Sequence, residues 1–235
     1  MLCNIADLIV DVPEAGGMSP RLREYQTDAK NAADIELSEG AYRTDRWPGL
    51  SIEDAIYLES GFAFYGNLLR FNGLYLHSSA VELDGKAYLF SGPCGMGKST
   101  HTRIWQQVFG EKAKVFNDDK PALRRMEDRW YAYGTPWCGK DGININMKVP
   151  LAGICFLKQA SENHIRRLNN VEAISLFLTQ TMRKFKDGAN TALLLENLDK
   201  LVREIPIFEL ENRPEPEAAM LSYETMRRAA EEAGL

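Results

Sequence analysis

The chain reads Gly92-Pro93-Cys94-Gly95-Met96-Gly97-Lys98-Ser99 just after the apolar run Ala87-Tyr88-Leu89-Phe90. The first stretch satisfies every fixed position of the Walker A pattern G-x-x-x-x-G-K-[ST], and the second predicts the strand that precedes such a loop. Apolar residues at core spacing from Ile104 to Phe109 predict the helix that follows. Glycine permits turns that aim successive N–H groups at a polyanion, and the helix adds its positive N-terminal end. The stretch therefore predicts a phosphate-binding loop between a strand and a helix.

Three side chains at the end of this loop have chemistry suited to a nucleotide. Lys98 supplies a positive charge, Ser99 a hard oxygen for Mg2+, and Thr100 a hydrogen bond to a further phosphate. The expected ligands are ATP, or another nucleoside triphosphate, and Mg2+. The residues expected to bind them are Gly92, Gly95, Met96, Gly97, Lys98, Ser99 and Thr100. The alternative is a glycine-rich turn without a ligand.

Composition limits the class of protein. The 235 residues, 45% of them hydrophobic, suffice for one large domain or for a core with appendages. The net charge of -5 argues against general binding to nucleic acid or to anionic membranes. No apolar run is long enough to span a membrane and the N-terminus lacks the basic start of a secretion signal, so we expect a cytoplasmic protein. Four widely spaced cysteines without a C-x-x-C pair argue against a zinc site or a disulfide framework.

We expect three portions. Residues 1–73 form an N-terminal portion of small strands and an amphipathic helix packed on the core. Residues 74–160 form the nucleotide-binding core that carries the phosphate loop. Residues 161–235 form a helical C-terminal portion of the same domain.

The N-terminal portion is predicted from short signals. Residues 2–12 predict a first strand, and residues 35–37 and 41–43 predict short strands, with a polar and partly irregular segment between the first two. Ser51 is a candidate N-cap for the amphipathic helix. The residues predicted on the core side of that helix are Ala55, Leu58, Phe62, Tyr65 and Leu69.

A hairpin feeds the phosphate loop. Residues 74–81 predict a strand, 84–86 the turn, and 87–90 the strand that enters the loop. Strand alternation places His77 on the same face as Tyr75 and Ser79. His77 therefore lies either near the nucleotide phosphates or in the core with its ring nitrogens satisfied.

Two adjacent carboxylates follow the next predicted strand. Residues 113–116 are apolar and lead into Asn117-Asp118-Asp119. Successive residues point in different directions, so one carboxylate can hold Mg2+, directly or through water, while the other faces an acceptor. A solvated acidic turn before Pro121 is the alternative.

The remaining pattern alternates strands and then helices. A hairpin is predicted around a turn at 126–129, an alternating strand at 143–147 and a buried strand at 151–157. The glycine-rich segment 134–142 between them is either a substrate-facing loop or a hairpin end whose aromatics cover the core. Helices are predicted at about 171–181, 190–203 and 216–233, with a strand or extended link at 205–210. The basic cluster Arg183, Lys184 and Lys186 is either a solvated turn or a contact for an acidic substrate or a neighbouring subunit.

Taken in order, His77, the phosphate loop, the doubled aspartate and a following lysine and strand pair resemble the HPr kinase/phosphorylase catalytic domain. That domain belongs to the phosphoenolpyruvate carboxykinase-like group of P-loop folds, and the resemblance covers about residues 74–157. It implies an α/β (α+β) fold, a P-loop core of mixed sheets with flanking helices. A doubly wound sheet is not expected, because the phosphate loop is flanked by hairpins with few crossover helices.

The resemblance also implies roles. Asp118 would be the base that takes the proton from an acceptor hydroxyl, and Asp119 with Ser99 would bind Mg2+. Lys98 would hold the β- and γ-phosphates, and His77 matches the family's histidine ahead of the loop. The chain is thereby expected to be an ATP- and Mg2+-dependent kinase, because phosphoryl transfer needs charge neutralisation and in-line placement above all.

The segment 134–142 lacks the glutamate of the HPr kinase signature, so the resemblance leaves open both HPr as substrate and the reverse phosphorylase reaction. Smaller HPr-kinase-like proteins include some that phosphorylate serine in ribosomally made peptides. We expect the acceptor to be a hydroxyl of a protein, peptide or small molecule, and the resemblance suggests a homo-oligomer. The residues considered for acceptor binding are Lys120, Thr135, Trp137 and Lys140.

Two other functions stay open. The chain can be a regulatory protein in which a bound nucleotide only orders the loop at 134–142, without catalysis. It can also be a carboxykinase-like enzyme, although it is short for one and shows no further set of lysine, histidine and aspartate metal ligands.

Overall fold

A computed structural model of the chain describes residues 1–13, 18–37, 44–182 and 188–235. The strands are β1 (Leu2–Ile5), β2 (Leu8–Asp11), β3 (Ile35–Glu36), β4 (Gly73–Tyr75), β5 (Ser78–Leu83), β6 (Lys86–Ser91), β7 (Lys114–Asp119), β8 (Ala122–Met126), β9 (Arg129–Tyr133), β10 (Lys148–Gln159), β11 (His164–Arg167) and β12 (Ile207–Asn212). The α-helices are α1 (Ser19–Leu22), α2 (Ile52–Leu68), α3 (Lys98–Phe109), α4 (Asn170–Gln180), α5 (Gly188–Glu204) and α6 (Pro216–Glu232). The predicted strand at 41–43 and the basic cluster at 183, 184 and 186 lie outside the described residues.

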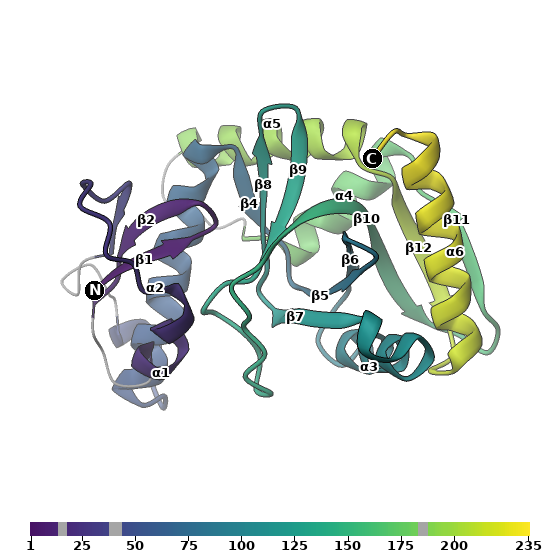
Figure 1. Cartoon of the computed structure of the whole chain (residues 1–235), viewed down its shortest axis with the longest axis horizontal. Coiled ribbons are helices and arrows are strands. Elements are labelled where there is room, and N and C mark those ends of the chain that lie inside the picture. The colour runs from purple at the N-terminus through teal and green to yellow at the C-terminus, as the bar shows by residue number, and fades with distance from the viewer. Residues whose placement is uncertain (14–17, 38–43, 183–187) are drawn as a thin grey trace.

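The centre of the fold is a mixed sheet of nine strands, counted over the described ranges. Its order is β4-β8-β9-β10-β6-β5-β7, and β12, followed by β11, pairs on the other side of the distal part of β10. The long strand β10 joins two regions: its start pairs antiparallel with β9, and its remainder runs parallel to β6 and β12 (Figure 1). The expected mixed α/β class with flanking helices is confirmed.

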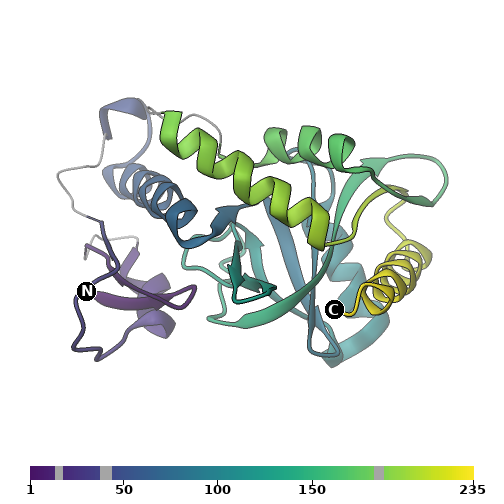
Figure 2. The ribbon, with the colours of Figure 1, turned by 90° about the horizontal axis from the view of Figure 1, so that it is seen from above.

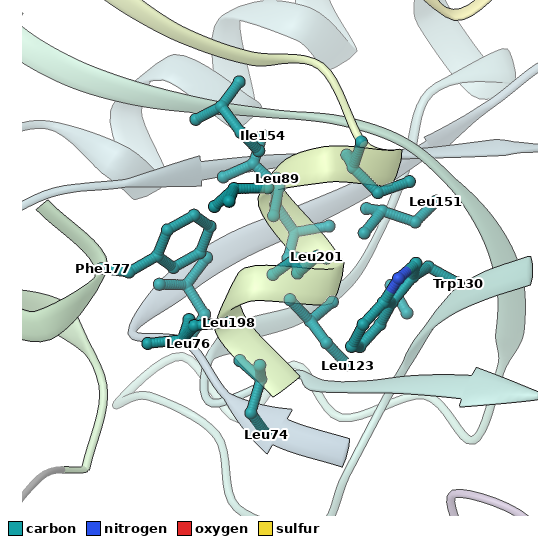
Figure 3. Packing of buried hydrophobic residues seen from close by; sticks show 14 of the residues in the cluster. Leu74, Leu76, Leu89, Leu123, Trp130, Leu151, Ile154, Phe177, Leu198 and Leu201 are labelled. Atoms are coloured by element: carbon teal, nitrogen blue, oxygen red, sulfur yellow. The ribbon is translucent and has the colours of Figure 1, made fainter. Parts of the chain in front are cut away.

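Helices cover the two faces of this sheet. In Figure 2, α5 and α6 lie on opposite sides of the strands. Leu89 of β6 faces the cluster that contains Leu198 and Leu201 of α5, as Figure 3 shows. Its neighbour Tyr88 faces the opposite cluster, which contains Trp105 of α3 and residues of α6. Strand β6 is therefore buried on both faces, which explains the unbroken apolar run before the phosphate loop.

The N-terminal portion forms a separate three-stranded sheet. The prediction of a single strand over residues 2–12 is wrong, because Ala6 and Asp7 both take positive φ and turn the chain into the β1–β2 hairpin. Strand β3, which the apolar signal at 35–37 predicts, adds to β2 in parallel. In Figure 1 this sheet and α6 lie at opposite ends of the long axis of the molecule.

Helix α2 begins where the sequence predicts, and Ala55, Tyr65 and Leu69 are buried as expected, but Phe62 is not. The Ser51 hydroxyl accepts a hydrogen bond of 3.1 Å from the Asp54 backbone N–H, which confirms the N-cap. Phe62, predicted to face the core, is 43% exposed and stacks on Trp47. Phe64 is buried instead and stacks on Trp137 at 4.8 Å, because α2 packs against both the N-terminal sheet and the segment after β9.

The prediction of a strand at 143–147 is also wrong. Only one isolated bridge forms there, between Asn117 and Asn144. The Asn144 and Asn146 side chains donate to the Arg21 and Glu24 carbonyl oxygens, so the segment binds the N-terminal portion rather than continuing a ladder.

The predicted hairpins β5–β6 and β8–β9, the buried strand β10 and the three C-terminal helices are all observed, and residues 207–212 form a strand. The single strand predicted at 74–81 is divided at Leu76 and His77 into β4 and β5, which pair with different partners. No helix of the described residues is long and apolar enough to cross a membrane.

Candidate active site

The phosphate loop joins β6 to α3 at one end of the large sheet. Gly95 and Gly97 have φ of 80° and 99°, a left-handed conformation that disfavours residues with a Cβ. Lys98 begins α3, and its buried Nζ donates to the carbonyl oxygens of Gly92 at 2.9 Å and Pro93 at 3.3 Å. Burial lowers the pKa of Lys98, although Asp119 and other nearby negative groups oppose the shift. Because the Lys98 ammonium contacts neutral carbonyl oxygens, its positive charge is not neutralised by them and can bind an anion.

Asp118 lies directly beside the loop. The Ser99 hydroxyl donates to Asp118 Oδ1 at 3.1 Å, and the Asp118 side chain is 7% exposed. The sheet explains this proximity, because β5 pairs Ser79 with Asp118, and the Ser79 hydroxyl bonds to Thr102 of α3 at 2.9 Å. Strand β5 thus fixes the first turns of α3 against the end of β7.

Asp119 is held by two basic groups. Its Oδ1 lies 3.0 Å from His77 Nε2, and its Oδ2 forms an ion pair with Lys120. Burial alone would raise the pKa of Asp119, but the His77 hydrogen bond and the Lys120 charge outweigh it and lower the pKa to about 2. The carboxylate is therefore ionised and oriented at neutral pH.

His77 is itself oriented by α4. Its Nδ1 lies 3.2 Å from Gln180 Oε1, and its backbone N–H donates to the Gln180 carbonyl at 2.8 Å. The Gln180 amide nitrogen donates to Thr179, which turns Oε1 toward the histidine. Because both ring nitrogens face oxygen acceptors, both hydrogen bonds form together when the ring is an imidazolium. Sequence reasoning missed Gln180, which lies on a helix far along the chain with no local motif.

The segment 134–142 divides into a buried half and an exposed half. Thr135 is fully buried and its hydroxyl donates to the Lys120 carbonyl at 2.8 Å, while buried Trp137 donates from Nε1 to Ser60 at 3.1 Å. Lys140 is exposed, and its neighbour Asp141 pairs with Arg103 of α3. The buried half agrees with the alternative in which aromatics cover the core, and a substrate-facing role for the exposed half stays a prediction.

Asn117, also missed from the sequence, ties that buried half to the aspartates. Its side-chain nitrogen donates to the Thr135 carbonyl at 3.0 Å, and its Oδ1 accepts from the Lys120 backbone N–H at 2.9 Å. The fully buried amide therefore fixes the turn that carries Asp119 and Lys120.

A pocket with a cavity volume of about 80 Å3 lies beside Lys120. We call it the aromatic pocket. Its lining residues are Tyr57, Leu58, Gly61, Phe62, Tyr65, Tyr75, Lys120, Trp137 and Met182. They come from α2, β4, the turn after β7, the loop after β9 and the segment just after α4, so no single stretch of sequence predicts the pocket.

The N-terminal portion supports one wall of this pocket. Arg21 donates to the Cys138 carbonyl at 3.2 Å, and its guanidinium lies 4.7 Å from the centre of the Tyr57 ring. The Tyr57 hydroxyl donates to the same carbonyl at 2.6 Å. The lysine of the pocket, Lys120, lies over the same ring at 5.4 Å.

The oxygens of Ser99 and Asp118 and the ammonium of Lys98 fit a nucleotide that is bound together with Mg2+. Within the described residues no three or more histidine, cysteine, aspartate or glutamate side chains gather as a metal site. Ser99 and Asp118 offer adjacent oxygens, which suits Mg2+, an ion commonly held by one or two protein oxygens together with phosphate oxygens and water. The left-handed glycines leave open space around the loop, and Lys98 supplies the cation for phosphate.

Comparison with known proteins identifies the family. The model of the family described as SynChlorMet cassette protein ScmC matches residues 56–213, more than half of the chain. The chain belongs to the ScmC family. The ScmC match contains the phosphate loop, both aspartates, His77 and Gln180, whereas the N-terminal sheet and α6 lie outside it.

No curated protein matches the chain significantly. Among solved structures, the Hpr(Ser) kinase/phosphatase from Coxiella burnetii aligns with 67% of this ScmC chain and 96% of its own, at 11% sequence identity and a TM-score of 0.38. That similarity is distant.

Proposed function

We propose that the chain is an ATP- and Mg2+-dependent kinase that transfers the γ-phosphoryl group to a hydroxyl. One observation carries the proposal: a buried lysine in a Walker A loop, a serine–aspartate oxygen pair and an oriented second carboxylate lie in one contiguous network. These are the groups that phosphoryl transfer requires, since it depends on positioning and electrostatic stabilisation more than on covalent chemistry.

The phosphate side of the proposal rests on Lys98 and the start of α3. When a nucleotide binds, Lys98 would exchange its carbonyl partners for β- and γ-phosphate oxygens. The loop N–H groups and the positive end of α3 would stabilise the same charges. Bound Mg2+ would neutralise charge on the phosphates during transfer.

The two aspartates can divide the remaining work in two ways. The family resemblance makes Asp118 the base and Asp119 a metal ligand with Ser99. The hydrogen bond between Ser99 and Asp118 favours the exchanged assignment, in which Asp118 serves the metal. Asp119 is paired with His77 and Lys120 instead of Ser99. In the exchanged assignment it is the carboxylate that faces the acceptor. We adopt the exchanged assignment as the proposal.

In this mechanism Asp119 accepts the hydroxyl proton of the acceptor late in the reaction. The acceptor oxygen forms its bond to the γ-phosphorus as the bond from that phosphorus to the bridging oxygen of ADP breaks, and ADP leaves with that electron pair. The proton then passes from Asp119 to water. A carboxylate with a pKa of about 2 releases it readily, and a loose transition state requires little proton transfer in advance.

The test is transfer of labelled γ-phosphate from ATP-Mg2+ into a fractionated extract separated into protein, peptide and small-molecule pools. Label should enter one pool, and Lys98→Ala and Asp119→Asn should each reduce it by about 10²-fold or more, as loss of a charged catalytic group does. The Mg2+ dependence of phosphate transfer by the Asp118→Asn variant shows which of the two aspartates binds the metal. Saturable ATP binding without label in any pool contradicts the kinase proposal and favours the regulatory function.

A further inference from the structure

The aromatic pocket lies beside Asp119, the carboxylate that we propose faces the acceptor hydroxyl. We infer that it binds a large apolar side chain of a peptide acceptor, next to the serine or threonine that receives the phosphate. This inference rests on the proposed kinase function and adds the class of acceptor to it.

The position of the pocket relative to the nucleotide supports an acceptor site. Asp118 accepts from Ser99 at the start of α3, and the next residue, Asp119, is paired with Lys120, which lines the pocket. The lysine of a Walker A loop reaches the β- and γ-phosphates. In the proposed kinase the γ-phosphate would therefore lie near the two aspartates, and the pocket adjoins Asp119 through Lys120.

The chemistry of the lining selects an apolar group. Five aromatic residues line the pocket, together with one leucine and one methionine. The Tyr57 and Tyr65 hydroxyls donate to the Cys138 and Lys120 carbonyls at 2.6 and 2.5 Å, so both are used within the protein. Lys120 is the one charged side chain among the described lining residues, and it is paired with Asp119. Apart from the Tyr75 hydroxyl, such walls offer rings and methyl groups, whereas a sugar or polyol would need several free polar groups.

The size and surroundings favour a peptide. A cavity of about 80 Å3 is well below the usual volume of ligand pockets and suits one side chain rather than a whole cofactor. Phe62 lines the pocket yet is 43% exposed, and it stacks on Trp47 with ring centres 5.9 Å apart. The apolar surface therefore continues outside the pocket, where the neighbouring residues of a peptide would lie.

The distance between pocket and carboxylate sets the spacing in the acceptor. The Lys120 ammonium marks it, because this group pairs with Asp119 and lies 5.4 Å from the centre of the Tyr57 ring, which lines the pocket. Successive Cα atoms are about 3.8 Å apart, so one or two residues cover such a separation. Leu, Ile, Met or Phe within two residues of the hydroxyl is the expected acceptor pattern.

The test uses short peptides with one central serine, identical except that the adjacent residue is Leu, Phe, Gly or Lys. Transfer of labelled γ-phosphate should be at least tenfold more efficient, in kcat/KM, for the Leu and Phe peptides than for the Gly peptide, mainly through KM. Phe62→Ala and the pocket-filling Leu58→Trp should reduce this preference without changing ATP binding. The matched control Leu195→Trp changes an exposed leucine of α5 and should retain the preference.

Equal efficiency for all four peptides, or label confined to the small-molecule pool, overturns the inference while leaving the kinase proposal intact. If no substrate is phosphorylated, equilibrium binding of the same peptides to the protein saturated with Mg2+ and a non-hydrolysable ATP analogue separates the two claims. Binding of the Leu and Phe peptides at least tenfold tighter than the Gly peptide, and weakened by Leu58→Trp, supports the pocket although the kinase proposal has failed. Equal binding overturns both.

Discussion

His77 Nε2 lies 3.0 Å from Asp119 Oδ1, and this contact connects the residue before β5 to the end of β7. The sheet produces it, because β5 pairs Ser78 with Asp119 and His77 is the residue before Ser78. With Lys120 on the other oxygen, the carboxylate is fixed at both ends. A substitution of His77 should therefore affect Asp119 more than it affects other residues.

His77→Ala should raise the pKa of Asp119 from about 2 toward its ordinary value of 3.8, because one of its two basic partners is lost. Since the folded pKa is depressed, the interaction stabilises the fold above about pH 3.8, and that stability is lost as the pH falls through about 2. NMR titration of the labelled aspartate carboxyl measures the shift directly. His77→Gln retains a donor and should show a smaller rise; an unchanged Asp119 titration in His77→Ala contradicts the prediction.

Ser99→Ala and Asp118→Asn should each raise the Mg2+ concentration for half-maximal phosphate transfer by about tenfold, since each removes one oxygen of the proposed metal pair. Asp119→Asn should instead lower kcat with little change in the Mg2+ requirement. Ser175→Ala, an exposed serine of α4, is the matched control for loss of a hydroxyl. If Asp119→Asn shifts the Mg2+ requirement and Asp118→Asn only lowers kcat, the assignment implied by the family resemblance is the correct one.

Gly134→Ala should destabilise the protein by about 3 kcal/mol, the upper end of typical overpacking costs. A Cβ at this position would overlap the backbone carbonyl of Ile145, and backbone cannot rotate aside as a flexible side chain does. Gly188→Ala, with open space around its Cβ at the start of α5, should leave stability unchanged or slightly raised. Urea unfolding of the two variants gives the comparison. Equal unfolding midpoints would contradict the prediction, because they would mean that the segment after β9 accommodates the added methyl group without loss of stability.

Elements with strong local signals were predictable from the sequence. The Asp84-Gly85 turn, the Walker A glycines and the period of the C-terminal helices each specify their structure within a few residues. The phosphate loop and the position of the doubled aspartate at a strand end follow from the same kind of signal. The roles of these residues stay predictions.

Contacts between distant segments were not predictable. Helix α2 packs on two sides, so its hydrophobic period does not say that Phe64 is buried and Phe62 exposed. Gln180 reaches His77 only because α4 lies beside the start of β5. The aromatic pocket gathers residues from Tyr57 to Met182, and its existence depends on packing that no single window contains.

The last prediction concerns His101, which lies in α3 just after the phosphate loop. Its side chain is 1% exposed and packs edge-on against Phe90 at 4.4 Å, and only Nε2 has a partner among the described residues, the Ser222 hydroxyl at 3.1 Å. Burial lowers the pKa of His101 from 6.5 to about 3. The folded state therefore keeps the ring neutral at pH values where the unfolded chain binds a proton.

Since the folded pKa is the lower one, the stability associated with neutral His101 is complete above about pH 6.5 and is lost as the pH falls toward about 3. The loss should approach about 1.4 kcal/mol per pH unit within that window, on the order of 5 kcal/mol in all. His101→Gln, which cannot titrate, should flatten the acid side of the stability curve, whereas His164→Gln, at an exposed position of β11, should not. Urea unfolding between pH 7 and pH 4 measures both slopes. A His101→Gln slope equal to that of the unaltered chain would mean that His101 is protonated in the fold with a partner for its second nitrogen.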